Sequence, residues 1–280
     1  MTIGQWIQEA ESKLQSVYES SEVRSILRYW LKERIRLQPH EWSIRRNEPL
    51  PEPAMLQSDL QELITAKPIQ YVLGYEWFDG MQLQVSEAVL IPRPETEELV
   101  HWIASIEKPT AVIADLCTGS GCIALALQKR FPEATVTGWD LSSAALEIAR
   151  KNAARLQLPV SFWQANVLES FSHFPELANT QVLVSNPPYV LTTEASQIHA
   201  NVLSFEPHLA LFVPADDAVI FYRNILQEAN LLSSVQSIYF ELNPDTAEEV
   251  AQIGQALHWK YTFRSDFQQK TRMIRFFREE

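Results

Sequence analysis

Hydrophobic positions in the first part of the chain recur every three or four residues. The clearest examples are Val23, Ile26, Leu27, Trp30 and Leu31, followed by Leu56, Leu60, Leu63 and Ile64. This spacing predicts amphipathic helices, separated by a loop in the proline-containing polar stretch of residues 39–53. We therefore expect residues 1–70 to form a small all-helical domain, which either packs onto the rest of the chain or holds a partner.

The pattern changes to alternation after Tyr71. Apolar and polar residues alternate around Asp79-Gly80, a dipeptide that strongly predicts a hairpin turn. Two prolines then stiffen the segment Ile91-Pro92-Arg93-Pro94-Glu95-Thr96-Glu97, which leads into a helix ending near Ile106. The sequence thus predicts a β-hairpin linker over residues 71–94, with the proline-containing segment as a connector.

From residue 95 onward, apolar runs typical of strands alternate with helical patterns. This order predicts an α/β domain with a doubly wound, mostly parallel sheet over residues 95–280. The expected strands cover residues 111–116, 135–140, 160–163, 182–185 and 235–242, with a terminal β-pair at 261–263 and 273–277. The expected helices cover residues 122–130, 143–156 and 216–232, and Asp245 with Glu248 is expected to cap the next one. Residues 190–215 show little regular pattern, which predicts a long functional loop.

The turn after the first strand of this domain has the composition of a cofactor loop. It reads Asp115-Leu116-Cys117-Thr118-Gly119-Ser120-Gly121, and its glycines are two of only seven in the chain. Glycines at this point let the backbone approach a ligand closely. Asp140 ends the next strand, 19 residues after Gly121, and a carboxylate there can accept both hydroxyl protons of a ribose.

This loop alone does not identify the cofactor. Gly119, Gly121 and Ala124 also fit the dinucleotide fingerprint G-x-G-x-x-A, so a nicotinamide cofactor and another adenosine cofactor both remain open. Two roles are open for Asp115 as well: it holds the amino-acid end of the cofactor, or it caps the loop. The six histidines form no evident catalytic constellation, which argues against a dehydrogenase.

A second motif, Asn186-Pro187-Pro188-Tyr189, follows the apolar run Val182-Leu183-Val184. The Asn186 side chain offers a carbonyl oxygen, and the two prolines keep their carbonyls but have no N–H. The Tyr189 ring can lie against a flat conjugated group. We expect this turn to hold a planar –NH2 group, although taken alone it also fits an ordinary proline-stiffened turn. Together with the glycine loop, it indicates an S-adenosylmethionine-dependent methyltransferase.

Composition and charge narrow the candidate partners. The net charge is −12 and the pI about 5.0, whereas nucleic-acid binding usually needs a basic face. The N-terminus does not resemble a signal peptide, and no apolar run reaches the roughly 18 residues of a membrane span. Cys117 and Cys122 lack the partners of a disulfide framework or metal site, and we expect them to be small residues in a tight turn. We expect a cytoplasmic protein that binds neither membrane nor DNA directly.

At these residues the chain resembles the HemK/PrmC family of protein-glutamine methyltransferases, which act on peptide chain release factors. The likeness covers nearly the whole chain, and the segments that carry it are residues 68–74, 89–97, 115–121, 185–189, 205–207 and 210–212. It implies a seven-stranded Rossmann-like methyltransferase sheet, no metal, and a monomer that binds a release factor. It also implies that Cys117, Thr118, Gly119, Ser120, Gly121, Asp140 and Asn186 bind S-adenosylmethionine. Asn186, Pro187, Pro188 and Tyr189 would bind the glutamine of a Gly-Gly-Gln loop.

The chain departs from the family pattern at three cofactor-binding positions. Cys117 stands where many members have glycine, so the backbone there must accept a small side chain. Asn166 and Val167 stand where an aspartate and a bulky aromatic residue are usual, and both should flank the adenine. We expect Asn166 to bind the adenine amino group through its side-chain carbonyl, and the missing ring at Val167 to weaken stacking.

Our mechanistic hypothesis assigns the acceptor amide to Asn186 and its neighbours. The Asn186 side-chain oxygen and the Pro187 carbonyl would each accept one amide hydrogen, and Tyr189 would pack on the amide plane. The loop of residues 190–215 would cover this acceptor site. Three alternatives remain: methylation of an exocyclic base amine in DNA or ribosomal RNA, an S-adenosylmethionine-binding scaffold without catalysis, and, last, a nicotinamide enzyme.

Overall fold

The computed structural model describes residues 1–278, which form two compact units. The first contains residues 1–75 and 199–205, and the second contains residues 76–198 and everything described from Glu206 onward. None of the helices in this part of the chain combines the length and the apolarity that a membrane span requires.

The first unit is helical, as predicted. It contains α1 (Ile3–Leu14), α2 (Ser20–Ile35), α3 (Pro53–Leu63), α4 (Ile69–Leu73) and α8 (Ala200–Phe205). Trp6 and Trp30 meet edge to face in its core, with ring centroids 4.7 Å apart. The indole N–H of Trp30 and the guanidinium of Arg34 both donate to the buried carboxylate of Asp59, which satisfies the one charge in this core.

The predicted hairpin is present and carries the predicted turn. It consists of β1 (Tyr75–Phe78) and β2 (Met81–Gln84), joined at Asp79 and Gly80 with φ of 47° and 67°. Two consecutive positive φ angles are what a tight two-residue hairpin turn requires. The next helix, α5 (Pro94–Ile106), begins inside the proline-containing segment and ends where the sequence predicted.

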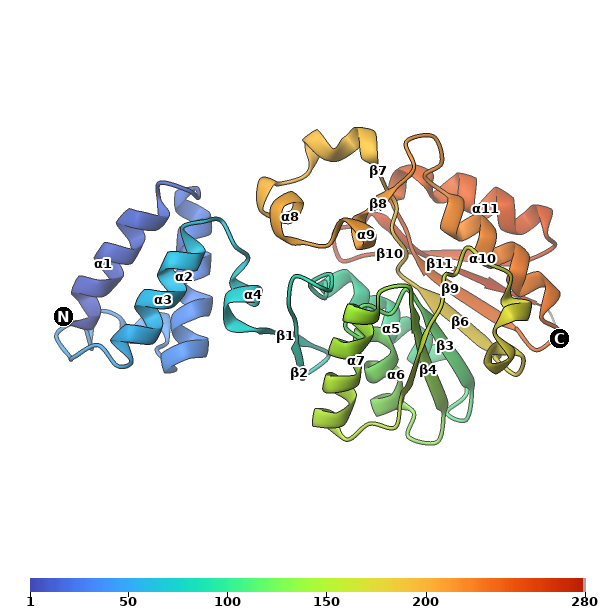
Figure 1. The fold of residues 1–280 in the computed structure, drawn as a ribbon, viewed down its shortest axis with the longest axis horizontal. Helices are drawn as coiled ribbons and strands as arrows, with labels where there is room; N and C mark the ends of the chain where they lie inside the picture. The colour runs from blue at the N-terminus through green and yellow to red at the C-terminus, as the bar shows by residue number, and fades with distance from the viewer. Residues whose placement is uncertain (279–280) are drawn as a thin grey trace. The chain divides into compact units, whose positions relative to one another are not determined.

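The second unit is built on a seven-stranded sheet in the order β10-β11-β9-β6-β3-β4-β5 (Figure 1). The parallel strands are β3 (Val112–Leu116), β4 (Thr135–Asp140), β5 (Ser161–Gln164), β6 (Val182–Ser185) and β9 (Ser237–Glu241). At the other edge, β11 (Thr271–Phe277) pairs antiparallel with both β9 and β10 (Lys260–Ser265). The prediction of a doubly wound, mostly parallel sheet with a terminal β-pair is confirmed.

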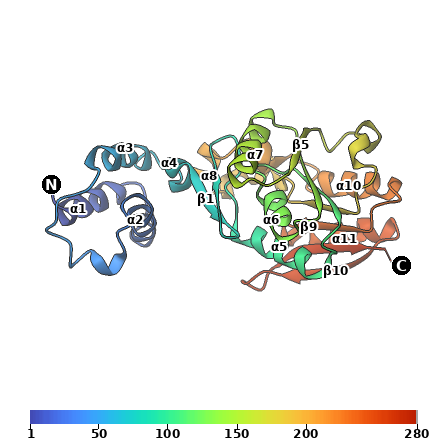
Figure 2. The ribbon, with the colours of Figure 1, turned by 90° about the horizontal axis from the view of Figure 1, so that it is seen from below.

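Helices cover both faces of this sheet, and the layers can be followed in Figures 1 and 2. On one face, α5, α6 (Cys122–Arg130) and α7 (Ser143–Leu156) pack on strand residues such as Ile113 and Val184. On the other, α10 (Ile220–Leu231) and α11 (Ala247–Ala256) pack on the alternate residues Ala114 and Leu183. Burial of strands on both faces explains their continuous apolar runs.

The strand order reverses next to β3, and this places the predicted motifs together. The chain runs from β3 outward through β4 to β5, and then returns to the other side of β3 as β6. Leu116 at the end of β3 lies in register with both Trp139 of β4 and Ser185 of β6. Ligands of such sheets bind outside the carboxyl ends of the strands at this point.

Two predictions of local structure were wrong. Residues 190–215 are not irregular: they form β7 (Val190–Leu191), a 3-10 helix (Thr192–Gln197), α8, α9 (His208–Leu211) and β8 (Phe212–Val213). Each piece is two to six residues long, too short to show a hydrophobic period. Asp245 does not cap α11 with Glu248. Asp245 lies in a 3-10 turn, where its backbone N–H donates to the Asn243 side chain, and α11 begins two residues later.

Candidate active site

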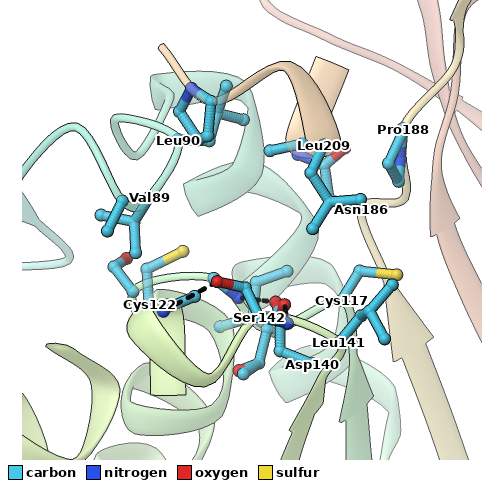
Figure 3. Close-up of a pocket in the computed structure, with 18 of the residues that line it drawn as sticks. Val89, Leu90, Cys117, Cys122, Asp140, Leu141, Ser142, Asn186, Pro188 and Leu209 are labelled. Carbon is cyan, nitrogen blue, oxygen red and sulfur yellow. Dashed lines mark hydrogen bonds between the residues drawn. The ribbon is translucent and has the colours of Figure 1, made fainter. Parts of the chain in front are cut away.

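A cavity of about 270 Å³ lies at the carboxyl ends of β3, β4 and β6. Figure 3 shows Cys117, Asp140 and Asn186 around it. Of the residues predicted from the sequence, those that line it are Cys117, Thr118, Gly119, Ser120, Asp140, Asn166, Val167, Asn186 and Pro188. Gly121, Pro187 and Tyr189 are not among its lining residues. The structure thus brings both predicted motifs to one cavity.

The glycine loop owes its shape to three left-handed residues. Cys117, Gly119 and Gly121 have φ of 60°, 55° and 82°. A Cβ at Gly121 would lie 3.2 Å from both Ala149 and Phe162. Both the positive φ and this lack of space therefore favour glycine at position 121. Cys117 adopts a conformation that costs an L-residue roughly 1–2 kcal/mol and that glycine adopts without this cost. Burial raises the pKa of the Cys117 thiol, which therefore stays neutral.

The Asp140 carboxylate is fixed by the backbone. One oxygen accepts the N–H of Gly119 at 2.9 Å, and the other accepts the N–H of Ser142 at 2.8 Å. Burial raises the pKa of Asp140, and these backbone hydrogen bonds oppose that rise. Asp140 lines the cavity, and a carboxylate has about four acceptor positions, so it can still accept from a pair of ligand hydroxyl groups.

Asp115 is a fully buried loop cap. Its Oδ2 accepts the hydroxyl of Thr118 at 2.5 Å and the N–H of Ala124 in the first turn of α6 at 3.1 Å. It does not line the cavity, and its Oδ1 has no hydrogen-bond partner within the described residues. Burial raises the pKa of Asp115 to about 7. Of the two roles that the sequence left open, the structure supports capping.

Asn166 and Val167 line the cavity through a short turn after β5. The Asn166 side-chain oxygen already accepts the N–H of Leu168 at 3.1 Å, which leaves one lone pair for a ligand. Val167 is buried, and its carbonyl accepts the side-chain amide of Asn224. An aromatic residue from a different element, Phe221 of α10, lines the same cavity. No local pattern around Phe221 indicates this position, because it depends on tertiary packing.

The Asn186 side chain is held at its nitrogen end. Its Nδ2 donates to the hydroxyl of Thr96 at 3.4 Å, and that hydroxyl donates to the carboxylate of Glu241 at 2.6 Å. Its Oδ1 makes no hydrogen bond within residues 1–278. Tyr189 packs instead with Cys117 and Phe221 against the core on the α10 and α11 face of the sheet. The predicted roles of Pro187 and Tyr189 stay predictions.

The connector proposed from the sequence forms a wall of the cavity. Residues 88–93 and Thr96 line it, as do Pro207, Leu209 and Ala210 from the segment between β6 and α10. Glu206, which is buried, joins these two parts: its carboxylate accepts the guanidinium of Arg93 at 2.5 Å and the N–H of Ile91 at 3.3 Å. No short-range pattern links positions 113 residues apart, so the sequence could not indicate this contact.

Comparison with known proteins identifies the family. Residues 5–74 match the model of the PrmC N-terminal domain, and residues 96–205 match that of the methyltransferase small domain. The release factor glutamine methyltransferase of Flavobacterium psychrophilum is 41% identical over 223 residues, which are 77% of each chain. That of Bacteroides thetaiotaomicron is 43% identical over 195 residues, 68% of this chain and 69% of its own. The chain belongs to the release factor glutamine methyltransferase family.

Solved structures of more distant methyltransferases share the fold of the family. The hMettl16 catalytic domain, in complex with MAT2A 3'UTR hairpin 6, aligns with a TM-score of 0.59 at 12% identity, over 72% of this chain and 77% of its own. A methyltransferase from Pyrococcus furiosus aligns with a TM-score of 0.52 at 16% identity, over 71% of this chain and 89% of its own. Within the described residues, no group of three or more His, Cys, Asp or Glu side chains could hold a metal ion.

Proposed function

We propose that this protein transfers a methyl group from S-adenosylmethionine to the side-chain amide nitrogen of the glutamine in the Gly-Gly-Gln motif of peptide chain release factors. The observation that carries the proposal is the pairing of Asp140 and Asn186 on one cavity, the first with carboxylate lone pairs and the second with an amide oxygen that has no partner. The names of the family relatives support the choice of substrate.

The residues present suit the methyl donor. The Asp140 carboxylate fits ribose hydroxyls, and the backbone of Cys117 to Ser120 fits the amino-acid end near the start of α6. Asn166 and Phe221 offer a polar edge and a ring for the adenine. Bound there, S-adenosylmethionine would supply an electrophilic methyl group and leave as S-adenosylhomocysteine.

The acceptor amide needs orientation more than a base. Asn186 Oδ1 and the Pro187 carbonyl each accept one hydrogen of the glutamine –NH2, which fixes the plane of the amide and directs its nitrogen into the cavity. Alignment of reacting atoms at roughly 3–3.5 Å supplies much of the acceleration. Apart from Asp140, which is assigned to the ribose, the cavity lining contains no carboxylate, histidine or lysine, and burial raises the pKa of both of its cysteines. This lining fits a transfer without a general base, in which the amide nitrogen releases one proton to solvent once it has gained the methyl group.

The helical residues 1–70 would recognise the release factor, residues 71–94 would link the parts, and residues 95–280 would carry out the transfer. Such a substrate implies a cytoplasmic protein, and we expect a monomer. The same Asn-Pro-Pro-Tyr motif also fits an exocyclic amine of DNA or ribosomal RNA. However, residues 76–280 carry 14 lysines and arginines against 25 aspartates and glutamates, which disfavours a phosphate backbone as partner.

A labelled-methyl assay distinguishes these substrates. S-adenosylmethionine with a labelled methyl group is offered, with the full-length enzyme, to a release factor, to duplex DNA and to ribosomal RNA. We expect label only in the release factor, and peptide mass spectrometry should locate it on the motif glutamine. A release factor carrying Gly-Gly-Ala serves as the matched control and should stay unlabelled. Label in either nucleic acid, or in the control, would contradict the proposal.

A further inference from the structure

We infer that Thr96 and Glu241 are positioning residues, which fix the orientation of the Asn186 amide so that its oxygen faces the acceptor. This inference rests on the proposed function and assigns the two residues a part in it. Three elements far apart in the sequence meet here: Asn186 follows β6, Thr96 lies in the first turn of α5, and Glu241 ends β9. Strands β6 and β9 are neighbours, with Ser185 in register with Phe240.

The chain of hydrogen bonds has one direction. A threonine hydroxyl has a single hydrogen, and Thr96 donates it to the Glu241 carboxylate at 2.6 Å. The hydroxyl therefore presents a lone pair to Asn186, and only the –NH2 end of the Asn186 amide can donate to it, here at 3.4 Å. The oxygen end is then left for the cavity, on whose wall Figure 3 shows Asn186 beside Leu209 and Pro188.

The opposite orientation would disable the site. Reversal of the Thr96 hydroxyl would let it donate to Asn186 Oδ1, and the amide would turn its –NH2 group toward the substrate. The Asn186 N–H groups would then face the glutamine hydrogen that Oδ1 accepts, and only the Pro187 carbonyl would remain as an acceptor. The ionised carboxylate of Glu241 disfavours this reversal, because hydrogen bonds to a carboxylate are roughly twice as strong as those between neutral groups.

Glu241 is buried, and its carboxylate has few polar partners. Thr96 is the one side chain in the described structure that donates a hydrogen bond to its carboxylate. The charged groups around it are Arg272 of β11, and Arg93 and Glu95 at the start of α5, with the Tyr189 and Tyr222 rings nearby. Burial raises the pKa of Glu241 to about 7, and the Thr96 hydrogen bond opposes that rise. A group needed only for packing would be better replaced by an apolar side chain.

The test is a double-mutant cycle with Thr96→Val and Asn186→Ala in the full-length enzyme. Thr96→Val keeps the shape of the side chain but removes its hydroxyl. In the wild-type background it should lower single-turnover methylation of a release factor about 10-fold to 100-fold, as expected for a misplaced reacting group. Binding of S-adenosylmethionine, measured by calorimetry, should change less than about 3-fold, a difference under about 0.7 kcal/mol. Thr96→Ser restores the hydroxyl and should recover at least a third of the wild-type rate.

The decisive comparison is made without Asn186. If Thr96 acts through Asn186, then Thr96→Val should change the residual rate of Asn186→Ala by less than about 2-fold. An equal loss in both backgrounds would assign Thr96 to packing and overturn the inference, as would failure of Thr96→Ser to recover the rate. Should Thr96→Val bind the cofactor poorly, Thr96→Ala, which adds no bulk, takes its place in the same cycle. Absence of methylation by the wild-type enzyme would instead overturn the proposed function.

Discussion

Asp140 and Asn186 face the same cavity, but different kinds of interaction hold them in place. Asp140 is held by two backbone N–H groups, beside a loop whose shape comes from left-handed residues. Asn186 is held by the side chain of Thr96, which is in turn held by the side chain of Glu241. The proposed cofactor side is therefore preorganised by the backbone and the proposed acceptor side by three side chains. We expect changes on the first side to alter binding and folding, and changes on the second to alter the rate.

The largest effect on the cofactor side is expected from Asp140→Ala. It removes a charged acceptor and leaves the N–H groups of Gly119 and Ser142 without their partner. A hydrogen bond to a charged group contributes about 1.5–3 kcal/mol, so the loss of two such bonds to ribose hydroxyls, about 3–6 kcal/mol, should raise the dissociation constant for S-adenosylmethionine about 100-fold or more. Calorimetry measures it. Asp217→Ala, which removes an ion-paired carboxylate that does not line the cavity, serves as the control and should leave affinity unchanged.

A second prediction concerns stability and the buried Asp115. Its pKa is about 7 in the folded protein, above the ordinary value of about 4. The folded state therefore binds this proton more tightly than the unfolded state. The resulting stabilisation is complete below pH about 4 and is lost as the pH rises through about 7, a change of up to about 4 kcal/mol.

Asp115→Asn cannot ionise and keeps an oxygen for Thr118 and Ala124. Urea unfolding at pH 5 and pH 8 should therefore show a smaller loss of stability in the variant than in the wild-type protein. A residual loss is expected from Glu241, whose pKa is raised to about 7 by the same cause. Parallel pH profiles for the two proteins would refute the assignment.

The two loop glycines offer a matched pair. Both have positive φ, but a Cβ at Gly121 would crowd Ala149, Phe162 and Leu125, whereas a Cβ at Gly119 would meet nothing within 4 Å. Gly119→Ala should destabilise the protein by about 1 kcal/mol through the backbone alone. Gly121→Ala should cost about 2–3 kcal/mol, because crowding is added. Thermal unfolding measures both, and equal losses would show that space at Gly121 does not matter.

The sequence predicted the sheet because its signals are local. Residues 111–116 and 182–185 are long enough to show an apolar run, the glycine loop directly follows the first of them, and Asp140 lies 19 residues after Gly121. The short pieces within residues 190–215 could not be predicted, because each is two to six residues long and none repeats its hydrophobic pattern over more than about two periods.

The candidate site was predictable only on the side that local motifs define. The cavity wall at residues 88–93, the ring of Phe221 and the contact between Thr96 and Glu241 all arise from tertiary packing. Thr96 and Glu241 are 145 residues apart, and nothing around either residue indicates the other. Because these contacts depend on tertiary packing, the local pattern of residues 91–97 predicted only a connector.

The central claim is that the acceptor side controls the rate of transfer and the cofactor side controls affinity. It is tested most directly by Asn186→Ala, with methyl transfer and cofactor affinity measured on the same preparation. We predict that the turnover number for a release factor falls at least about 100-fold, comparable to the loss of one preorganised hydrogen-bonding group in other active sites. The dissociation constant for S-adenosylmethionine should stay within about 3-fold of the wild-type value. Unchanged turnover, or a loss of affinity as large as the loss of turnover, would contradict the account.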